Sequence, residues 1–161
     1  SEALMKRDEG RHLTEISKSD ILTLQGIGDS HAGVLEHLGI RTIGELAKYK
    51  YFLMARSIKT LSEVETKGGR LTGSVMNIDN GIITAAETKS FTEMVTSPLH
   101  IMEGVTTKTE DLFATFGIKT VGDLADFKYC RWAEAIVELA KHEEGHTDAE
   151  RKVDRELKRL E

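Results

Sequence analysis

The chain has 161 residues, of which 39% are hydrophobic, 6% aromatic and 30% charged, so it is long enough for one domain or for two small ones with thin cores. It carries 22 basic and 27 acidic side chains, and the net charge of −5 argues against a protein that bulk charge holds to nucleic acid. One proline and few aromatic residues favour helices over a β-sandwich. No apolar run is long enough to cross a bilayer, so we expect no membrane span.

The single cysteine, Cys130, excludes an internal disulfide framework and a cysteine-rich zinc site. We interpret it as a small core residue rather than a nucleophile. A single cysteine without a disulfide partner in the chain is typical of a protein in a reducing intracellular compartment. The chain starts at Ser1 without a visible signal peptide, and import into an organelle with removal of a leader stays open.

The chain contains two copies of one segment. Residues 11–62 align with residues 89–140 without a gap, at an offset of 78 (89 minus 11), and 15 of the 52 positions are identical. The clearest stretch reads GIRTIGELAKYKY at 39–51 and GIKTVGDLADFKY at 117–129. A period this long indicates two folding units rather than a solenoid of short repeats.

The first copy has helical periodicity. Apolar residues at 21–24 precede a Gly-Ile-Gly turn at 26–28, and the next helical run ends at Gly39, which we predict as its C-cap. Thr42, with a glutamate three residues later, predicts a capping box for the following helix. A longer helix is then expected over residues 52–61.

The second copy repeats this pattern. Ser97 and Pro98 predict a helix start with proline at the first helical position. Thr107 and Thr120, each followed three residues later by a carboxylate, predict two capping boxes. The last long helix is expected over residues 132–140.

The segments outside the two copies are of different kinds. Glycines between 66 and 88 predict a linker, in which residues 76–81 weakly echo residues 5–10 at an offset of 71. The tail carries apolar residues at the spacing of one helix face, namely Ala149, Val153, Leu157 and Leu160. We therefore predict a first repeat with its lead-in at 1–65, a linker at 66–88, a second repeat at 89–145 and a C-terminal amphipathic helix at 146–161.

The stretch at 22–47, LTLQGIGDSHAGVLEHLGIRTIGELA, resembles a helix-hairpin-helix unit. Such units have a Gly-hydrophobic-Gly hairpin between two helices, often followed by a Gly-Ile-x-Thr segment. Residues 99–125 match less well, because Thr106 replaces the second glycine and Glu110 replaces the small Ala32. The resemblance implies an all-α fold with two tandem helix-hairpin-helix-like units plus the C-terminal amphipathic helix.

In that family many hairpins bind nucleic-acid phosphate through backbone N–H groups at the hairpin and the helix N-terminus, which suits an anion. The resemblance therefore implies Gly26, Ile27 and Gly28 as a candidate phosphate site. Asp29 directly follows this hairpin, and acidic residues flank the second one, so carboxylates would repel a phosphate there. Nucleic-acid binding stays as the alternative function.

Basic and aromatic residues recur in both copies as candidate contact residues: Arg41 and Lys119, Lys50 and Lys128, Tyr51 and Tyr129. Such side chains are common at protein interfaces. The interpretation we prefer for the Lys-Tyr pairs is that the tyrosines anchor one helix on the next and the lysines are solvated. A cation at a helix start is unfavourable for the helix dipole, so Arg41 and Lys119 hint at a contact or at shared ancestry.

The segment 142–146 fits the pattern H-E-x-x-H, which would suit a zinc-dependent hydrolase using His142, Glu143 and His146. Gly145 is expected to end the helix and the surroundings are polar, so this is a remote alternative. We expect no metal, no cofactor and no catalytic residues. The sequence predicts a non-catalytic helical binding or scaffold protein that contacts other proteins as a small subunit of a larger assembly, with an oligomeric state that it does not indicate.

Overall fold

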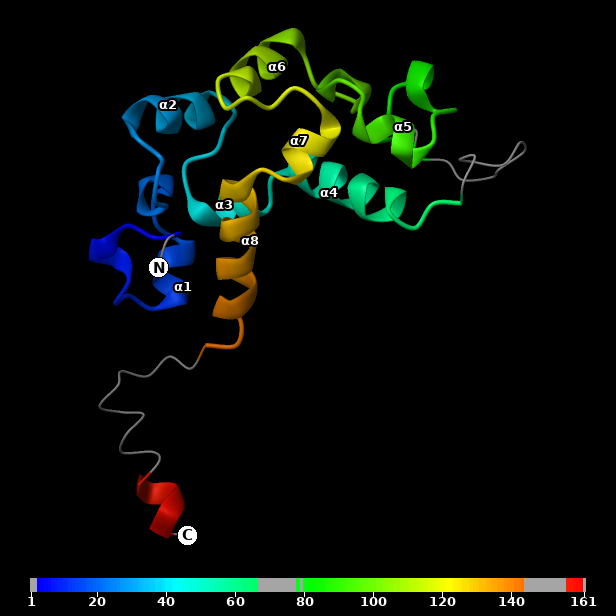
Figure 1. The fold of residues 1–161 in the computed structure, drawn as a ribbon. Coiled ribbons are helices and arrows are strands. Elements are labelled where there is room, and N and C mark those ends of the chain that lie inside the picture. The colour runs from blue at the N-terminus through cyan, green and yellow to red at the C-terminus, as the bar shows by residue number, and fades with distance from the viewer. Residues whose placement is uncertain (1–2, 67–77, 79, 144–155, 161) are drawn as a thin grey trace.

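In the computed structural model of the chain, the described residues are 3–66, 78, 80–143 and 156–160 (Figure 1). Within these residues the protein is all-α, as predicted: it consists of α-helices and short 3₁₀ helices, with isolated β-bridges and no strand. None of the helices in these ranges is long and apolar enough to span a membrane.

The two copies fold alike. The first comprises η1 (Lys6–Asp8), α1 (Leu13–Ser17), η2 (Ile21–Thr23), α2 (Asp29–His37), α3 (Ile43–Ala47) and α4 (Lys50–Ser62). The second comprises η3 (Thr84–Ala86), α5 (Phe91–Val95), η4 (Leu99–Ile101), α6 (Thr107–Ala114), α7 (Val121–Ala125) and α8 (Lys128–Ala140). Each element of the second copy lies 78 residues after its counterpart, except that α6 ends one residue early.

The lead-ins are also equivalent at the offset of 78, not at 71. The first pairs Leu4 with Leu24 in an antiparallel bridge, and the second pairs Ile82 with Met102. Ile82 and Ala86 are almost completely buried. Residues 82–88, which the sequence analysis assigned to the linker, are therefore part of the second folded unit.

The long helices are exchanged between the copies. Helix α8 lies along α1 and α3 of the first copy, and α4 lies along α5 and α7 of the second (Figure 1). The buried residues of both copies form one hydrophobic cluster, to which α4 contributes Phe52 and Ala55 and α8 contributes Ala133. Complete burial of a side chain such as Phe52 stabilises the fold by about 1.5–3 kcal/mol. Neither copy closes its core without the other, so the two units pack as one body.

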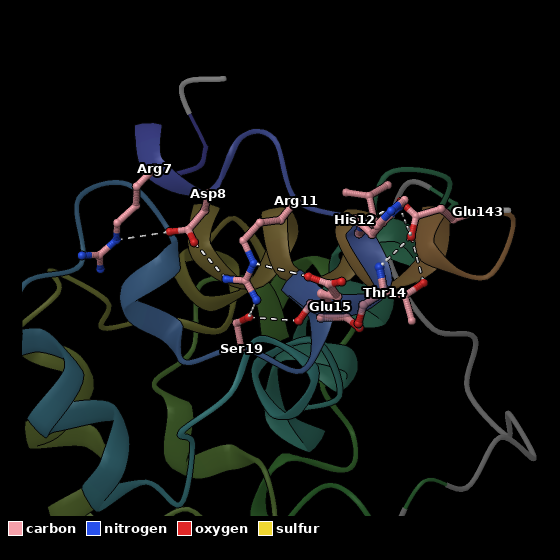
Figure 2. A network of polar contacts seen from close by, with 10 residues as sticks. Arg7, Asp8, Arg11, His12, Thr14, Glu15, Ser19 and Glu143 are labelled. Carbon is pink, nitrogen blue, oxygen red and sulfur yellow. Dashed lines mark hydrogen bonds and ion pairs between the residues drawn. The ribbon is translucent and has the colours of Figure 1, made fainter. Parts of the chain in front are cut away.

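A glutamate after each long helix caps the N-terminus of a helix in the other copy. Both carboxylate oxygens of Glu143 accept hydrogen bonds at the start of α1, from Leu13 N (2.7 Å), Thr14 N (3.0 Å) and Thr14 Oγ1 (2.9 Å) (Figure 2). Glu65 caps α5 in the same way, accepting from Phe91 N (2.8 Å), Thr92 N (3.1 Å) and Thr92 Oγ1 (2.9 Å). A carboxylate at a helix N-terminus satisfies free N–H groups and complements the helix dipole.

The first lead-in is held by a polar network around Asp8, a position that is apolar in the second copy. The buried Asp8 accepts a hydrogen bond from Arg11 Nη1 (2.9 Å), and Arg11 Nη2 donates to Ser19 Oγ (2.7 Å), which ties η1 to the end of α1 (Figure 2). The second copy has the apolar Ala86 at the position of Asp8. The two copies thus attach equivalent lead-ins by different chemistry.

The predicted helix ends are partly confirmed. Thr42 Oγ1 accepts from Glu45 N (3.1 Å), and Thr120 forms a reciprocal capping box with its carboxylate partner. The prediction for Thr107 is wrong by one residue, because Thr106 is the N-cap of α6 and accepts from Thr109 N (3.3 Å). Pro98 is the residue before η4 rather than its first helical residue.

The predicted tail helix at 146–161 lies mostly outside the described residues. Residues 156–160 are helical, and both Leu157 and Leu160 are exposed there.

Candidate functional site

The first glycine of each hairpin receives a tyrosine of the other copy. Gly26 has φ +98° and Gly104 has φ +94°, a region that favours glycine. A Cβ placed on Gly26 would lie 2.6 Å from the hydroxyl oxygen of Tyr129, and one placed on Gly104 would lie 2.5 Å from that of Tyr51. The glycines are thus needed both for the turn and for the close approach of α8 and α4.

The second residue of each hairpin motif is internal and the third begins a helix. Ile27 is buried, whereas Gly28 is the N-cap of α2 with no side-chain cap and with open space around the position of a Cβ. In the second copy, Thr106 occupies the equivalent N-cap and supplies its own hydroxyl. Asp29 is exposed in the first turn of α2. The first hairpin therefore has an open helix N-terminus with a carboxylate beside it.

The recurrent basic residues before α3 and α7 serve local structure. Arg41 forms an ion pair with Glu36 (Nη2 to Oε1, 3.2 Å), and its carbonyl accepts a hydrogen bond from Ile21 N (3.1 Å). The backbone N–H of Lys119 donates to Asp123 Oδ2 (3.0 Å). Both side chains are exposed and so are accessible to a partner, and the backbone contacts at these positions do not require a basic side chain.

The two Lys-Tyr pairs lie at the first turns of the long helices. Tyr129 is buried and Tyr51 half-buried, both against a hairpin glycine, whereas Lys50 and Lys128 are exposed. The ammonium group of each lysine lies over the ring of the following tyrosine, 5.4 Å from the centroid for Lys50 and 5.1 Å for Lys128. The tyrosines hold the two copies together and the lysines face solvent.

Of the three residues of the possible zinc site, the structure describes His142 and Glu143. Helix α8 ends at Ala140, so His142 and Glu143 lie beyond it, and His146 falls outside the described residues. Glu143 already caps α1, and the N–H of Thr14 that donates to it keeps the pKa of its carboxyl below the usual value. No group of three histidine, cysteine or acidic residues in the described part of the chain has a metal-binding arrangement.

Exposed apolar side chains recur at the ends of the long helices. Leu61 on α4 and Leu139 on α8 occupy equivalent positions (61 plus 78) and are 48% and 59% exposed. Val64, just beyond α4, is 79% exposed. Leu61 also borders a groove of about 940 Å³ whose described lining residues are uncharged, namely Leu53, Met54, Ser57, Ile58, Leu61, Ile78, Asn80, Gly81, Ile82 and Phe91.

An ion pair joins equivalent positions of the two copies. Arg56 of α4 pairs with Glu134 of α8, and these positions are 78 residues apart. A self-paired position of this kind lies on the approximate two-fold axis that relates the copies. The axis places the apolar groove of α4 and the outer face of α8 at related positions of one body.

Sequence reasoning missed the exchange of the long helices and the two glutamate caps. A signal for the caps was present, since Glu65 and Glu143 are identical at the offset of 78, as are their partners Thr14 and Thr92. The alignment at 11–62 and 89–140 stopped three residues before these glutamates. No known family model, curated protein or solved structure matches the chain.

Proposed function

We propose that this protein is a non-catalytic helical binding protein that joins other proteins as a small subunit of a larger assembly. The observation that carries the proposal is the pair of exposed leucines, Leu61 and Leu139, at equivalent positions of two diverged copies. Single exposed apolar residues are common on monomers, but Leu61 continues into a groove whose described lining is mostly apolar, and such a surface is typical of protein contacts.

Their position explains how one small chain would contact two partners. The C-terminal ends of α4 and α8 lie far apart on the body, because each long helix runs along a different copy (Figure 1). The two leucines therefore present separate contact points on one rigid body. A scaffold with two related contacts joins two partners, or two parts of one partner, without catalysis.

Purification of interacting proteins from the native source tests this proposal. Replacement of both leucines, Leu61→Ser with Leu139→Ser, should reduce recovery of the specific partners while circular dichroism stays unchanged. The matched control carries Thr60→Ser, an exposed position one residue before Leu61 that lines neither groove. Equal recovery with wild type, control and leucine variant would contradict the proposal.

The second candidate is a nucleic-acid-binding accessory factor, favoured by the open N-terminus of α2 at Gly28. It predicts binding of duplex or single-stranded oligonucleotide that weakens steeply with salt and is lost in Gly28→Glu. The exposed carboxylate of Asp29 in the same turn opposes it. Absence of binding at low salt would refute this second candidate.

A further inference from the structure

The outer face of α8 forms a groove with a chemistry different from that on α4. It has a volume of about 750 Å³ and lies between Arg56 of α4 and one side of α8. Its lining side chains from α8 are Lys128, Arg131, Trp132, Glu134, Ala135 and Glu138. Cations, carboxylates and one half-buried indole thus share a surface that is hollow enough to receive a chain segment.

Two of the cations in this groove have no anionic partner among the described residues. Glu134 is paired with Arg56, and Glu138 is paired with Lys141 (2.9 Å), so both carboxylates are neutralised within the protein. No carboxylate of a described residue forms an ion pair with Lys128 or Arg131, and both side chains are exposed. The first turn of α8 contains no acidic residue either. The groove therefore has an excess of positive charge on a protein whose net charge is −5.

The aromatic residue of the groove is held in place by its neighbours. The ring of Trp132 lies 5.6 Å from that of Tyr129 in an edge-on arrangement, and the ammonium group of Lys128 lies 5.6 Å from the centre of the Trp132 ring. Tyr129 is itself buried against the first hairpin. A flat apolar surface next to a free cation is thus fixed before any partner arrives.

The first copy shows that this chemistry is not required by the fold. Leu53 and Met54 occupy the positions of Arg131 and Trp132, and they line the groove of α4. The lysine at the first turn is present in both copies. The second copy therefore has a cation and an indole at two positions where the first has a leucine and a methionine.

We propose that the groove on α8 binds an acidic peptide segment of a partner protein, with its carboxylates on Lys128 and Arg131 and an apolar side chain on Trp132. The inference rests on the proposed function and specifies the partner chemistry of one surface. Charge complementarity supports the assignment, because two unpaired cations select carboxylates. A peptide fits better than nucleic acid, because a phosphate backbone is held by a long row of cations, whereas this groove offers two cations without a carboxylate partner among the described residues, on a protein whose net charge is −5.

Trp132 is the one tryptophan of the chain and so reports directly on this groove. The full chain is titrated with a short peptide of glutamates around a central leucine, and with a version in which glutamine replaces every glutamate. We expect a saturable change in tryptophan emission with the acidic peptide and none with the neutral one. Lys128→Gln with Arg131→Gln should weaken the affinity about tenfold or more. The matched control, Lys50→Gln with Leu53→Gln, changes the equivalent positions of α4 and should leave the affinity unchanged.

Several results would overturn the inference. One is that the acidic peptide causes no saturable change in emission, or the same change as the neutral peptide. Another is that the double variant at Lys128 and Arg131 binds the acidic peptide as tightly as the wild type does. A third is that single-stranded DNA binds saturably and the peptide does not. Circular dichroism of each variant shows whether it still folds. The conservative variant Arg131→Lys keeps the positive charge and should therefore keep most of the affinity. If the peptide fails while Leu61→Ser with Leu139→Ser still loses its partners, the proposed function stands and only this inference falls.

Discussion

Substitution of the first hairpin glycine tests the exchanged packing most directly. Gly26→Ala has two costs that add. An alanine at φ +98° is strained by about 1–3 kcal/mol. Its Cβ would also lie 2.6 Å from the hydroxyl of Tyr129, about 0.8 Å inside an ordinary contact of 3.4 Å, and relief of such overpacking costs about 1–3 kcal/mol. We expect the free energy of unfolding to fall by about 2–6 kcal/mol.

The overlap between the added Cβ and the Tyr129 hydroxyl cannot be relieved by a simple rotation of the tyrosine ring. Tyr129 is buried and lies between the rings of Phe127 and Trp132, with centroids 5.5 and 5.6 Å away. Removal of the hydroxyl should relieve it, since the next atom, Tyr129 Cζ, is 3.6 Å from the added Cβ. Gly26→Ala combined with Tyr129→Phe should therefore recover about 1–3 kcal/mol while the backbone strain remains.

Urea unfolding followed by far-UV circular dichroism measures these differences, provided that the slope with urea is unchanged. Gly28→Thr is the matched control in the same hairpin, because position 28 has open space and the second copy has a threonine there. It should be neutral or stabilising by up to about 1 kcal/mol through a new N-cap. If Gly26→Ala costs under about 0.5 kcal/mol, or Tyr129→Phe recovers nothing, then α8 does not pack on the first hairpin and the exchange is wrong.

Three further measurements test the rest of the body. The N–H of Thr14 lowers the pKa of Glu143 in the folded state, so its contribution to stability is present above the unfolded value of 4.5 and is lost as the pH falls through the folded value. Thermal unfolding of Glu143→Gln should therefore differ from wild type at pH 7 and converge with it at low pH; a constant difference would contradict the cap. Burial raises the pKa of Cys130, so a thiol reagent should label the native protein only as fast as it unfolds and the urea-unfolded protein at once. Arg56→Glu should cost about 0.2–1 kcal/mol in the free energy of unfolding, and the added change Glu134→Arg should restore most of it; no recovery would mean that the pair does not interact.

The sequence predicted features that depend on neighbouring residues. The helical class, the offset of 78 and the cap at Thr42 follow from local periodicity and from side chains three residues apart. The error at α6 has a local cause as well. Thr106 and Thr107 are adjacent, each has a polar residue three positions later, and the side chain alone does not indicate which of them starts the helix.

The exchange of the long helices was not predictable, for a reason of symmetry. Gly26 and Gly104 are equivalent, and so are Tyr51 and Tyr129. A tyrosine that fits the glycine of the other copy would fit the glycine of its own copy equally well. In a duplicated chain the residues specify which surfaces match, whereas the path of the backbone decides which copy supplies each surface. The structure resolves this choice, since Tyr129 meets Gly26 and Tyr51 meets Gly104.

The same symmetry separates positions held by packing from positions open to function. The inward face of α4 and α8 has the same residues at 55 and 133 and at 58 and 136, which the shared core explains.

Solvent-exposed positions have no such constraint, and Ser57 and Thr60 indeed differ from their counterparts in α8. Lys50 and Leu61 are the exceptions, because both are exposed and both are kept in α8. The lysine has a partial structural reason in its contact with the following tyrosine, but an exposed leucine gains nothing from solvent. Under the proposed function, its presence in both copies reflects a contact that a second protein completes.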